Sequence, residues 1–288
     1  MISDPLPQGL TEHLPEEIAE PLVRSADWLG AMAELTCSRS GESSCDWYHG
    51  AWQYLRLLDF VSSPWWHASF YRNALARQGA DRPEIRVLIS GCADFSTYAL
   101  VHSQLGDSAS ITSLDLCPTP LIATSWYARR IGASVPELLV ADAAEHKRPG
   151  CYDIIVSDSF LPRFRSDALM ELLRTWQTSL APEGAVLTTV RLHDTGPDED
   201  PRKTERLHRW RQAATDARTW WPGVSDLPLE QLHLRISAFV ANQERHSSLD
   251  TSTLRVLFAE AGFDHATIST HAYRGKRFAL IAAHKEPG

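Results

Sequence analysis

The fold of this chain is decided by one stretch, Ile85-Arg86-Val87-Leu88-Ile89-Ser90-Gly91-Cys92-Ala93-Asp94-Phe95. The apolar run predicts a buried strand, Gly91 predicts a tight turn, and the residues after it open a helix. The next predicted strand, 110–114, ends on Asp115, and Asp142 follows a third. A glycine where backbone can approach a ligand, followed by an acid that can accept ribose hydroxyls, is typical of a nucleotide-binding βαβ sheet.

Strands and helices alternate outward from this stretch. Between 84 and 195 the sequence predicts further short apolar strands over 138–140, 153–156 and 185–190, with a turn at 182–184 before the last. Helices are predicted between the strands, over 96–104, 118–131 and 166–180. This alternation implies a parallel sheet with helices on both faces. Two last strands, 265–271 and 278–283, are expected to close the sheet as an antiparallel pair.

Two helical segments fall outside this rhythm. Residues 1–83 are predicted to form a helical lid, and 196–248 a loop with two helices inserted into the sheet domain, 84–288. In the lid we expect a helix that begins near Ser43, with Asp46 as its capping-box partner. A later lid helix is expected to use Ser63 as its N-cap, with Pro64 at its first position.

The bulk properties narrow the class of partner. A formal net charge of −8 over 288 residues argues against a nucleic-acid surface, which needs a basic footprint, and favours a small-molecule substrate. No apolar run approaches the ~20 residues of a membrane span. The N-terminus shows no signal-peptide pattern, and the five cysteines are odd in number without paired spacing. We therefore expect a cytoplasmic protein without a membrane anchor; its oligomeric state is not determined.

Several motifs in the order observed resemble those of class I S-adenosylmethionine (SAM)-dependent methyltransferases. The resemblance covers roughly 84–192 and 250–285, and rests on 87–92 as first motif, on Asp115 and Asp142, on 152–158 and on 180–185. It implies a Rossmann-like doubly wound sheet and SAM as cofactor. Asp115 would hold the ribose diol and Asp142 would contact the adenine amino group. Other cofactor contacts would come from Gly91, Cys92, Ala93, Asp94, Leu116, Ala143, Ser157 and Ser159.

The first motif departs from the family pattern. Ile89 stands where an acid is usual, and Ala93 and Phe95 stand where further glycines are usual. Since that turn normally faces the methionine half of SAM, we expect this half to be held differently here. Asp94 is the nearest available acid.

A second resemblance concerns a bacterial subgroup that cyclises SAM to azetidine-2-carboxylate. It is carried by 90–94, by 115–121 with 126–128, and by the aromatic helix around Tyr48 and Trp52. Aromatic residues at helical spacing are more often core than site. A sulfonium is nevertheless a cation that aromatic faces attract, so Tyr48 and Trp52 are expected to face it. With Asp94 and Asp158 they are the catalytic candidates.

Two reaction types therefore stay open, methyl transfer to a small molecule and cyclisation of SAM with release of methylthioadenosine. A non-catalytic SAM-binding module is the alternative. An NAD-dependent enzyme is disfavoured because the turn after Gly91 lacks Gly-x-Gly-x-x-Gly. The histidines and cysteines show no His-x-x-x-His or Cys-x-x-Cys pairing, so the spacing predicts no metal site. The sequence does not identify a methyl acceptor.

Overall fold

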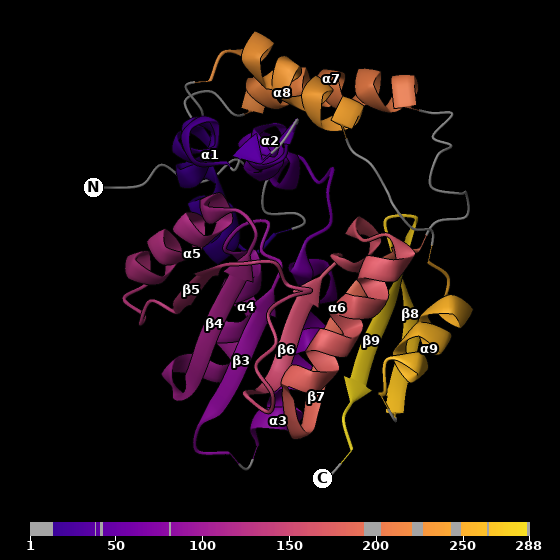
Figure 1. Ribbon diagram of the computed structural model, residues 1–288. Coiled ribbons are helices and arrows are strands. Elements are labelled where there is room, and N and C mark those ends of the chain that lie inside the picture. Colours follow the sequence, from indigo (N-terminus) through magenta and orange to yellow (C-terminus); the bar gives the residue numbers. More distant parts are fainter. Residues whose placement is uncertain are drawn as a thin grey trace.

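A seven-stranded sheet forms the centre of the protein in the computed structural model (Figure 1). The structure describes residues 14–37, 39–40, 43–80, 82–192, 203–220, 227–242, 249–263 and 265–286. The strand order is β5-β4-β3-β6-β7-β9-β8, in which β3 to β7 run parallel and β9 is antiparallel to both of its neighbours. The strands are β3 (Ile85–Ser90), β4 (Ala109–Asp115), β5 (Glu137–Val140), β6 (Tyr152–Asp158), β7 (Leu180–Leu192), β8 (His265–Tyr273) and β9 (Lys276–His284). The predicted Rossmann-like sheet with its antiparallel terminal pair is confirmed.

Both faces of the sheet are buried, which is why its central strands read as unbroken apolar runs. In β3, Val87 and Ile89 pack into the core cluster shared with α3, α4 and α5, whereas Leu88 packs into the cluster shared with α6 and α9. The helices are α3 (Ala68–Gly79), α4 (Ser96–Leu105), α5 (Pro118–Arg130), α6 (Ser166–Ser179) and α9 (Thr251–Glu260). Short 3₁₀ helices are η2 (Pro64–His67), η3 (Gly106–Ser108) and η4 (Leu161–Arg163).

The last helix of the predicted lid, α3, packs on a face of the sheet beside α4, whereas the first part of the lid lies over the carboxyl ends of the strands (Figure 1). It contains α1 (Glu16–Thr36) and α2 (Asp46–Leu57), joined by a small hairpin of β1 (Arg39–Ser40) and β2 (Ser43–Ser44). Above it lie the insert helices α7 (Lys203–Trp220) and α8 (Leu229–Asn242), with α8 in contact with α2. One apolar cluster runs from α1 and α2 into the sheet, so lid and sheet share a core. Parts of the predicted 196–248 insert lie outside the described residues.

Two local details of the backbone differ from the predictions. The helix expected from Ser43 begins at Asp46, and its N-cap is Cys45 without a side-chain cap. Ser43 instead pairs with Ser40 in the hairpin, three residues before the first residue of α2, so it is not the residue that caps this helix. The turn expected at 182–184 is present, with Glu183 at φ 62°, but it interrupts β7 instead of preceding the strand, and the pairing with β6 shifts register there. Ser63 does cap a helix as predicted, but that helix is η2, and α3 follows it.

Candidate functional site

The turn after β3 shows why Gly91 is a glycine. Its φ is +78°, a conformation that residues with a Cβ rarely adopt. A Cβ there would also lie 2.7 Å from a ring carbon of Phe160, the residue that precedes η4. In this structure the close approach to the Gly91 backbone, which the resemblance assigns to a cofactor, is made by a protein side chain.

Asp115, the last residue of β4, binds two backbone amides beside that turn. Its Oδ2 accepts a hydrogen bond from Cys92 N at 2.9 Å, and its Oδ1 accepts one from Cys117 N at 2.8 Å. Burial raises the pKa of Asp115 to about 6, although His49 and the two amides act in the opposite direction. The half-buried carboxylate thereby joins the β3 turn to the start of α5.

The predicted adenosine contacts gather at one edge of the sheet. Ala141 N donates to Asp115 O at 3.0 Å, which sets the segment after β5 beside β4. Asp142 is exposed there, and its Oδ1 accepts from Ala144 N at 2.8 Å. Leu116 is 63% exposed, an unusual value for a leucine, whereas Ala143 is buried. The trio of Gly91, Asp115 and Asp142 therefore lies along the carboxyl ends of three adjacent strands.

Asp94 is engaged by the lid. Its Oδ2 lies 2.6 Å from Arg56 Nε, and the two side chains are 0% and 3% exposed. Its Oδ1 also accepts a hydrogen bond from Ser96 N at 2.7 Å. Its predicted role as an available acid for the cofactor amine stays a prediction, but the carboxylate already holds a buried guanidinium. Cys92, by contrast, is simply buried, and burial raises the pKa of its thiol, as expected for a packed residue.

Tyr48 and Trp52 belong to an aromatic stack between the lid and the insert. Their ring centroids lie 4.6 Å apart in a stacked arrangement, and Phe239 of α8 stacks on Tyr48 at 5.7 Å. Guanidinium groups cover them as well, Arg163 at 4.5 Å from the Tyr48 centroid and Arg56 at 5.2 Å from the Trp52 centroid. A bound sulfonium would thus share these rings with two existing cations.

Burial and nearby charges act on the pKa of Tyr48. Burial raises the pKa of Tyr48, the charges of Arg163 and Arg56 lower it, and Asp115 contributes a further increase. Whether Tyr48 touches a cofactor stays a prediction.

Asp158 ends β6 within a polar group. Thr189 Oγ1 donates to its Oδ1 at 2.6 Å, and Tyr71 OH lies 3.3 Å from the same oxygen while donating to Ser157 O at 2.7 Å. The Ser157 hydroxyl is buried and donates to Ser90 O at 2.9 Å. Ser159 adopts φ 52° and its amide donates to Thr189 O. These bonds hold Asp158 at the carboxyl edge, beside the predicted nucleotide contacts.

His67 is a site candidate that the sequence reasoning missed. The side chain is 2% exposed, and neither ring nitrogen has a hydrogen-bond partner among the described residues. Burial lowers the pKa of His67, while the charge of Asp158 raises it in part, so the imidazole is neutral near pH 7. The local signal would have been weak, because a histidine after Pro64 and two tryptophans resembles ordinary core.

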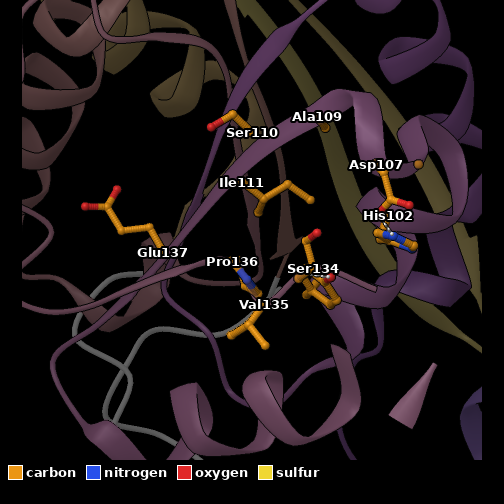
Figure 2. A pocket seen from close by; sticks show the side chains of 11 residues that line it. His102, Asp107, Ala109, Ser110, Ile111, Ser134, Val135, Pro136 and Glu137 are labelled. Atoms are coloured by element: carbon orange, nitrogen blue, oxygen red, sulfur yellow. Dashed lines mark hydrogen bonds and ion pairs between the residues drawn. The ribbon is translucent and has the colours of Figure 1, made fainter. Parts of the chain in front are cut away.

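A pocket of about 220 Å³ lies elsewhere in the fold. Figure 2 shows its wall of Ala109, Ser110 and Ile111 from β4 and of Pro136 and Glu137 at the start of β5. These are the amino-terminal halves of the two strands, whereas Asp115 and Val140 mark their carboxyl ends. We therefore assign no part of the predicted nucleotide site to this pocket.

A second cluster was missed because its members are far apart in the chain. Cys37, Cys45, His49 and Cys117 bring their potential ligand atoms within 4.8 Å of one another. The available signal was the four-residue spacing of Cys45 and His49, which places both on one face of a helix.

Comparisons with known proteins support the fold. No protein-family model matches the sequence, and no curated protein matches it. CurJ carbon methyltransferase is similar in structure, with a TM-score of 0.56 and 11% identity over 83% of this chain and 61% of its own. Phosphoethanolamine N-methyltransferase 2 of Haemonchus contortus, solved with SAM, has a TM-score of 0.53 and 12% identity over 83% and 56%. A possible exported protein from Bordetella parapertussis has a TM-score of 0.51 and 17% identity over 94% and 86%.

At such identities the likeness shows the fold alone, which is the Rossmann-like fold of class I methyltransferases. The chain spans about three fifths of the length of the two named methyltransferases. Within the described residues, the helices are either too short or too polar to cross a membrane.

Proposed function

We propose that this protein binds SAM, with the adenosine at the carboxyl ends of β3, β4 and β5, and transfers its methyl group to a small molecule. The observation that carries the proposal is the position of Asp115, held by the Cys92 and Cys117 amides beside the Gly91 turn. The SAM complex of the Haemonchus contortus enzyme, which has the same fold, supports the choice of cofactor.

The residues at this edge fit the adenosine half. Each carboxylate oxygen of Asp115 accepts one amide and keeps a lone pair for a ribose hydroxyl. Asp142 is exposed and can accept a hydrogen bond from the adenine amino group, and the exposed Leu116 can pack against the base. Ala143, Ser157 and Ser159 are further cofactor contacts that the resemblance to methyltransferases implies.

The methionine half has to be seated in another way. Phe160 covers Gly91, and Arg56 forms an ion pair with Asp94. The turn and the acid that would receive the methionine half of SAM are therefore already in contact with other protein groups. Arg163, above Tyr48, carries a charge that suits the carboxylate of the methionine arm. We include Arg163 in the proposed site for that reason.

Bound SAM supplies an electrophilic methyl group on a sulfonium. The protein contributes proximity and removes water from the site. The acceptor's lone pair forms the new bond to the methyl carbon while the carbon–sulfur electron pair returns to sulfur, which leaves S-adenosylhomocysteine. We assign His67 as the group that takes the acceptor's proton, because its imidazole is neutral and buried and neither ring nitrogen has a hydrogen-bond partner among the described residues.

Cyclisation of SAM is the second candidate, and the changed seat for the methionine arm is the observation that favours it. A bent arm would bring the α-amine behind its own γ-carbon. The amine would then form the ring bond, the carbon–sulfur pair would leave with methylthioadenosine, and the amine proton would pass to a base. Tyr48, Asp158 or His67 could serve, whereas the Arg56 ion pair makes Asp94 less available.

A non-catalytic SAM-binding module is the remaining alternative. The shared core of lid and sheet and the buried groups at the site support an enzyme, since a simple sensor has little need of them. We further propose a cytoplasmic location, because a reducing compartment suits a chain whose cysteines are all free in the structure.

The deciding experiment has two steps. Calorimetry should show binding of SAM and none of NAD. The protein is then incubated with SAM alone and with SAM plus a panel of small nucleophiles, and the products are identified by mass spectrometry. S-adenosylhomocysteine that forms only with an acceptor supports methyl transfer. Methylthioadenosine with a C4 imino acid from SAM alone would make the protein a cyclase, and absence of SAM binding would refute both.

A further inference from the structure

We propose that Cys37, Cys45, His49 and Cys117 bind a structural zinc ion. Their four ligand atoms lie within 4.8 Å of one another, and Cys37 Sγ lies 3.5 Å from His49 Nδ1. With Zn–S of about 2.3 Å and Zn–N of about 2.0–2.1 Å, a tetrahedral site has ligand–ligand edges of roughly 3.5–3.8 Å. The arrangement is thus close to that geometry and needs only a small contraction.

The four residues come from three separate segments that the fold brings together. Cys37 ends α1, Cys45 and His49 lie at the start of α2, and Cys117 directly precedes α5. Cys37, His49 and Cys117 are 7%, 6% and 3% exposed. Convergence of three thiols and an imidazole in one buried place is an arrangement that packing alone does not require.

The surroundings suit a metal-bound thiolate group. Thr119 Oγ1 lies 3.3 Å from Cys37 Sγ and 3.4 Å from Cys117 Sγ, so its hydroxyl can donate to either sulfur once it is deprotonated. The Thr36 hydroxyl lies 2.8 Å from that of Thr119 and 2.9 Å from Met32 O, and the Thr119 proton is left for a sulfur when Thr36 donates to Thr119. Hydrogen bonds of this kind commonly position and tune the ligands of a metal.

The ligand set selects the metal and its role. Three thiolates with one imidazole form the Cys₃His set of structural zinc sites, and soft sulfur ligands disfavour magnesium or calcium. Four protein ligands fill a tetrahedron and leave no position for substrate. A disulfide does not explain the cluster, because it would join two of the three thiols and leave the third unpaired. None of the cysteines is bonded to another in the structure.

The ion would fasten the lid to the sheet domain at the nucleotide edge. Cys117 follows Asp115 by two residues and donates its amide to that carboxylate, while His49 is the neighbour of Tyr48. Zinc would thus hold the α1–α2 junction against the start of α5. This inference does not rest on the proposed function, because the metal content is measured without SAM.

The test uses the full-length protein, purified under reducing conditions without a metal-affinity resin or chelator. Elemental analysis should find about one zinc per chain. Cys45→Ser, His49→Gln and Cys117→Ser should each lose most of that zinc, whereas Cys151→Ser, a half-exposed cysteine before β6, should retain it. Equal loss in Cys151→Ser, or full retention in all three cluster variants, would overturn the assignment.

A second measurement does not depend on how the variants fold. Cobalt(II) added to the reduced, metal-free wild-type chain should produce the d–d bands of a tetrahedral ion and thiolate-to-cobalt charge-transfer bands, and zinc should displace it. A wild-type protein that contains no zinc as purified and takes up neither zinc nor cobalt would show that the cluster is only a packed group of thiols.

Discussion

At the scale of single residues, Asp115 has an observed structural role and a proposed role in binding SAM. Its carboxylate accepts the Cys92 and Cys117 amides, which orders the β3 turn and the start of α5, and in the proposed function it would also accept a ribose hydroxyl. Asp115→Ala should weaken SAM binding by roughly 1.5–3 kcal/mol through loss of a charge-assisted hydrogen bond. Calorimetry measures the effect, and Asp107→Ala, an exposed acid at the opposite edge of the sheet, is the matched control. Unchanged affinity in a folded Asp115→Ala protein would defeat the assignment.

His67 is the proposed proton acceptor, a role that the preceding Pro64 and two tryptophans do not indicate. If it accepts the proton, His67→Asn should reduce turnover by roughly 10²–10⁴-fold and leave SAM affinity nearly unchanged. His102→Asn, in the pocket of Figure 2, provides the comparison. Steady-state kinetics beside calorimetry separate the two effects. A parallel loss of SAM binding would assign His67 to structure or to cofactor binding instead.

At the scale of elements, α2 is joined to the β3 turn by the buried pair of Arg56 and Asp94. Asp94→Asn leaves a buried guanidinium without its counter-charge and should cost about 3–5 kcal/mol. Glu20→Gln, which weakens the partly exposed pairs with Arg130 and Arg24, should cost less than about 1 kcal/mol. Urea unfolding compares the two variants. Similar small losses in both would mean that the lid is held to the turn by apolar packing alone.

The pairing of β3 with β6 has its own electrostatic anchor. Asp153 accepts from Arg86 N, Nε and Nη2 at 2.9, 3.1 and 2.9 Å, and from Arg82 Nη1 at 2.7 Å. Burial acts to raise the pKa of Asp153, but the bonds and charge of Arg86, with that of Arg82, outweigh it and hold the pKa below its ordinary value.

A depressed pKa in the folded state has a defined consequence for stability. The contribution of Asp153 is fully present above its unfolded pKa of about 3.9 and is lost as the pH falls through the lower folded value. The difference in unfolding free energy between wild type and Asp153→Asn should therefore be constant near neutral pH and shrink below about pH 4. Urea midpoints across this range test it. A difference that is independent of pH would show that the charge of Asp153 is not what matters.

At the scale of the whole molecule, lid and sheet share one core, because Leu22 and Leu55 belong to the same buried cluster as Val87 and Ile154. We expect the two parts to unfold together although they occupy separate stretches of sequence. Tryptophan fluorescence, to which Trp47, Trp52 and Trp65 of the lid contribute, should change with the same midpoint as far-ultraviolet circular dichroism. A separate early fluorescence transition would establish the lid, 1–83, as an independent domain.

The sequence by itself determined the sheet and the placement of Gly91, Asp115 and Asp142 at the carboxyl ends of its strands. Parallel strands buried on both faces are unbroken apolar runs, and a tight turn needs its glycine at the turn itself, so the signals for Gly91, Asp115 and Asp142 are local. Where two local signals compete, the prediction failed: Ser43 was expected to cap a helix, but it pairs with Ser40, three residues earlier, in a hairpin.

Only the tertiary structure decided what those residues meet. The partner of Asp94 is Arg56, Phe160 lies on Gly91, the charge of Asp158 acts on the pKa of His67, and Cys117 joins Cys37, Cys45 and His49. Most of these partners are tens of residues apart in the chain, so no spacing or periodicity encodes them. The physical reason is that charge pairing, ring packing and ligand geometry depend on distances of a few ångströms in space. Separation along the chain predicts such distances only within a helix turn or a strand pair.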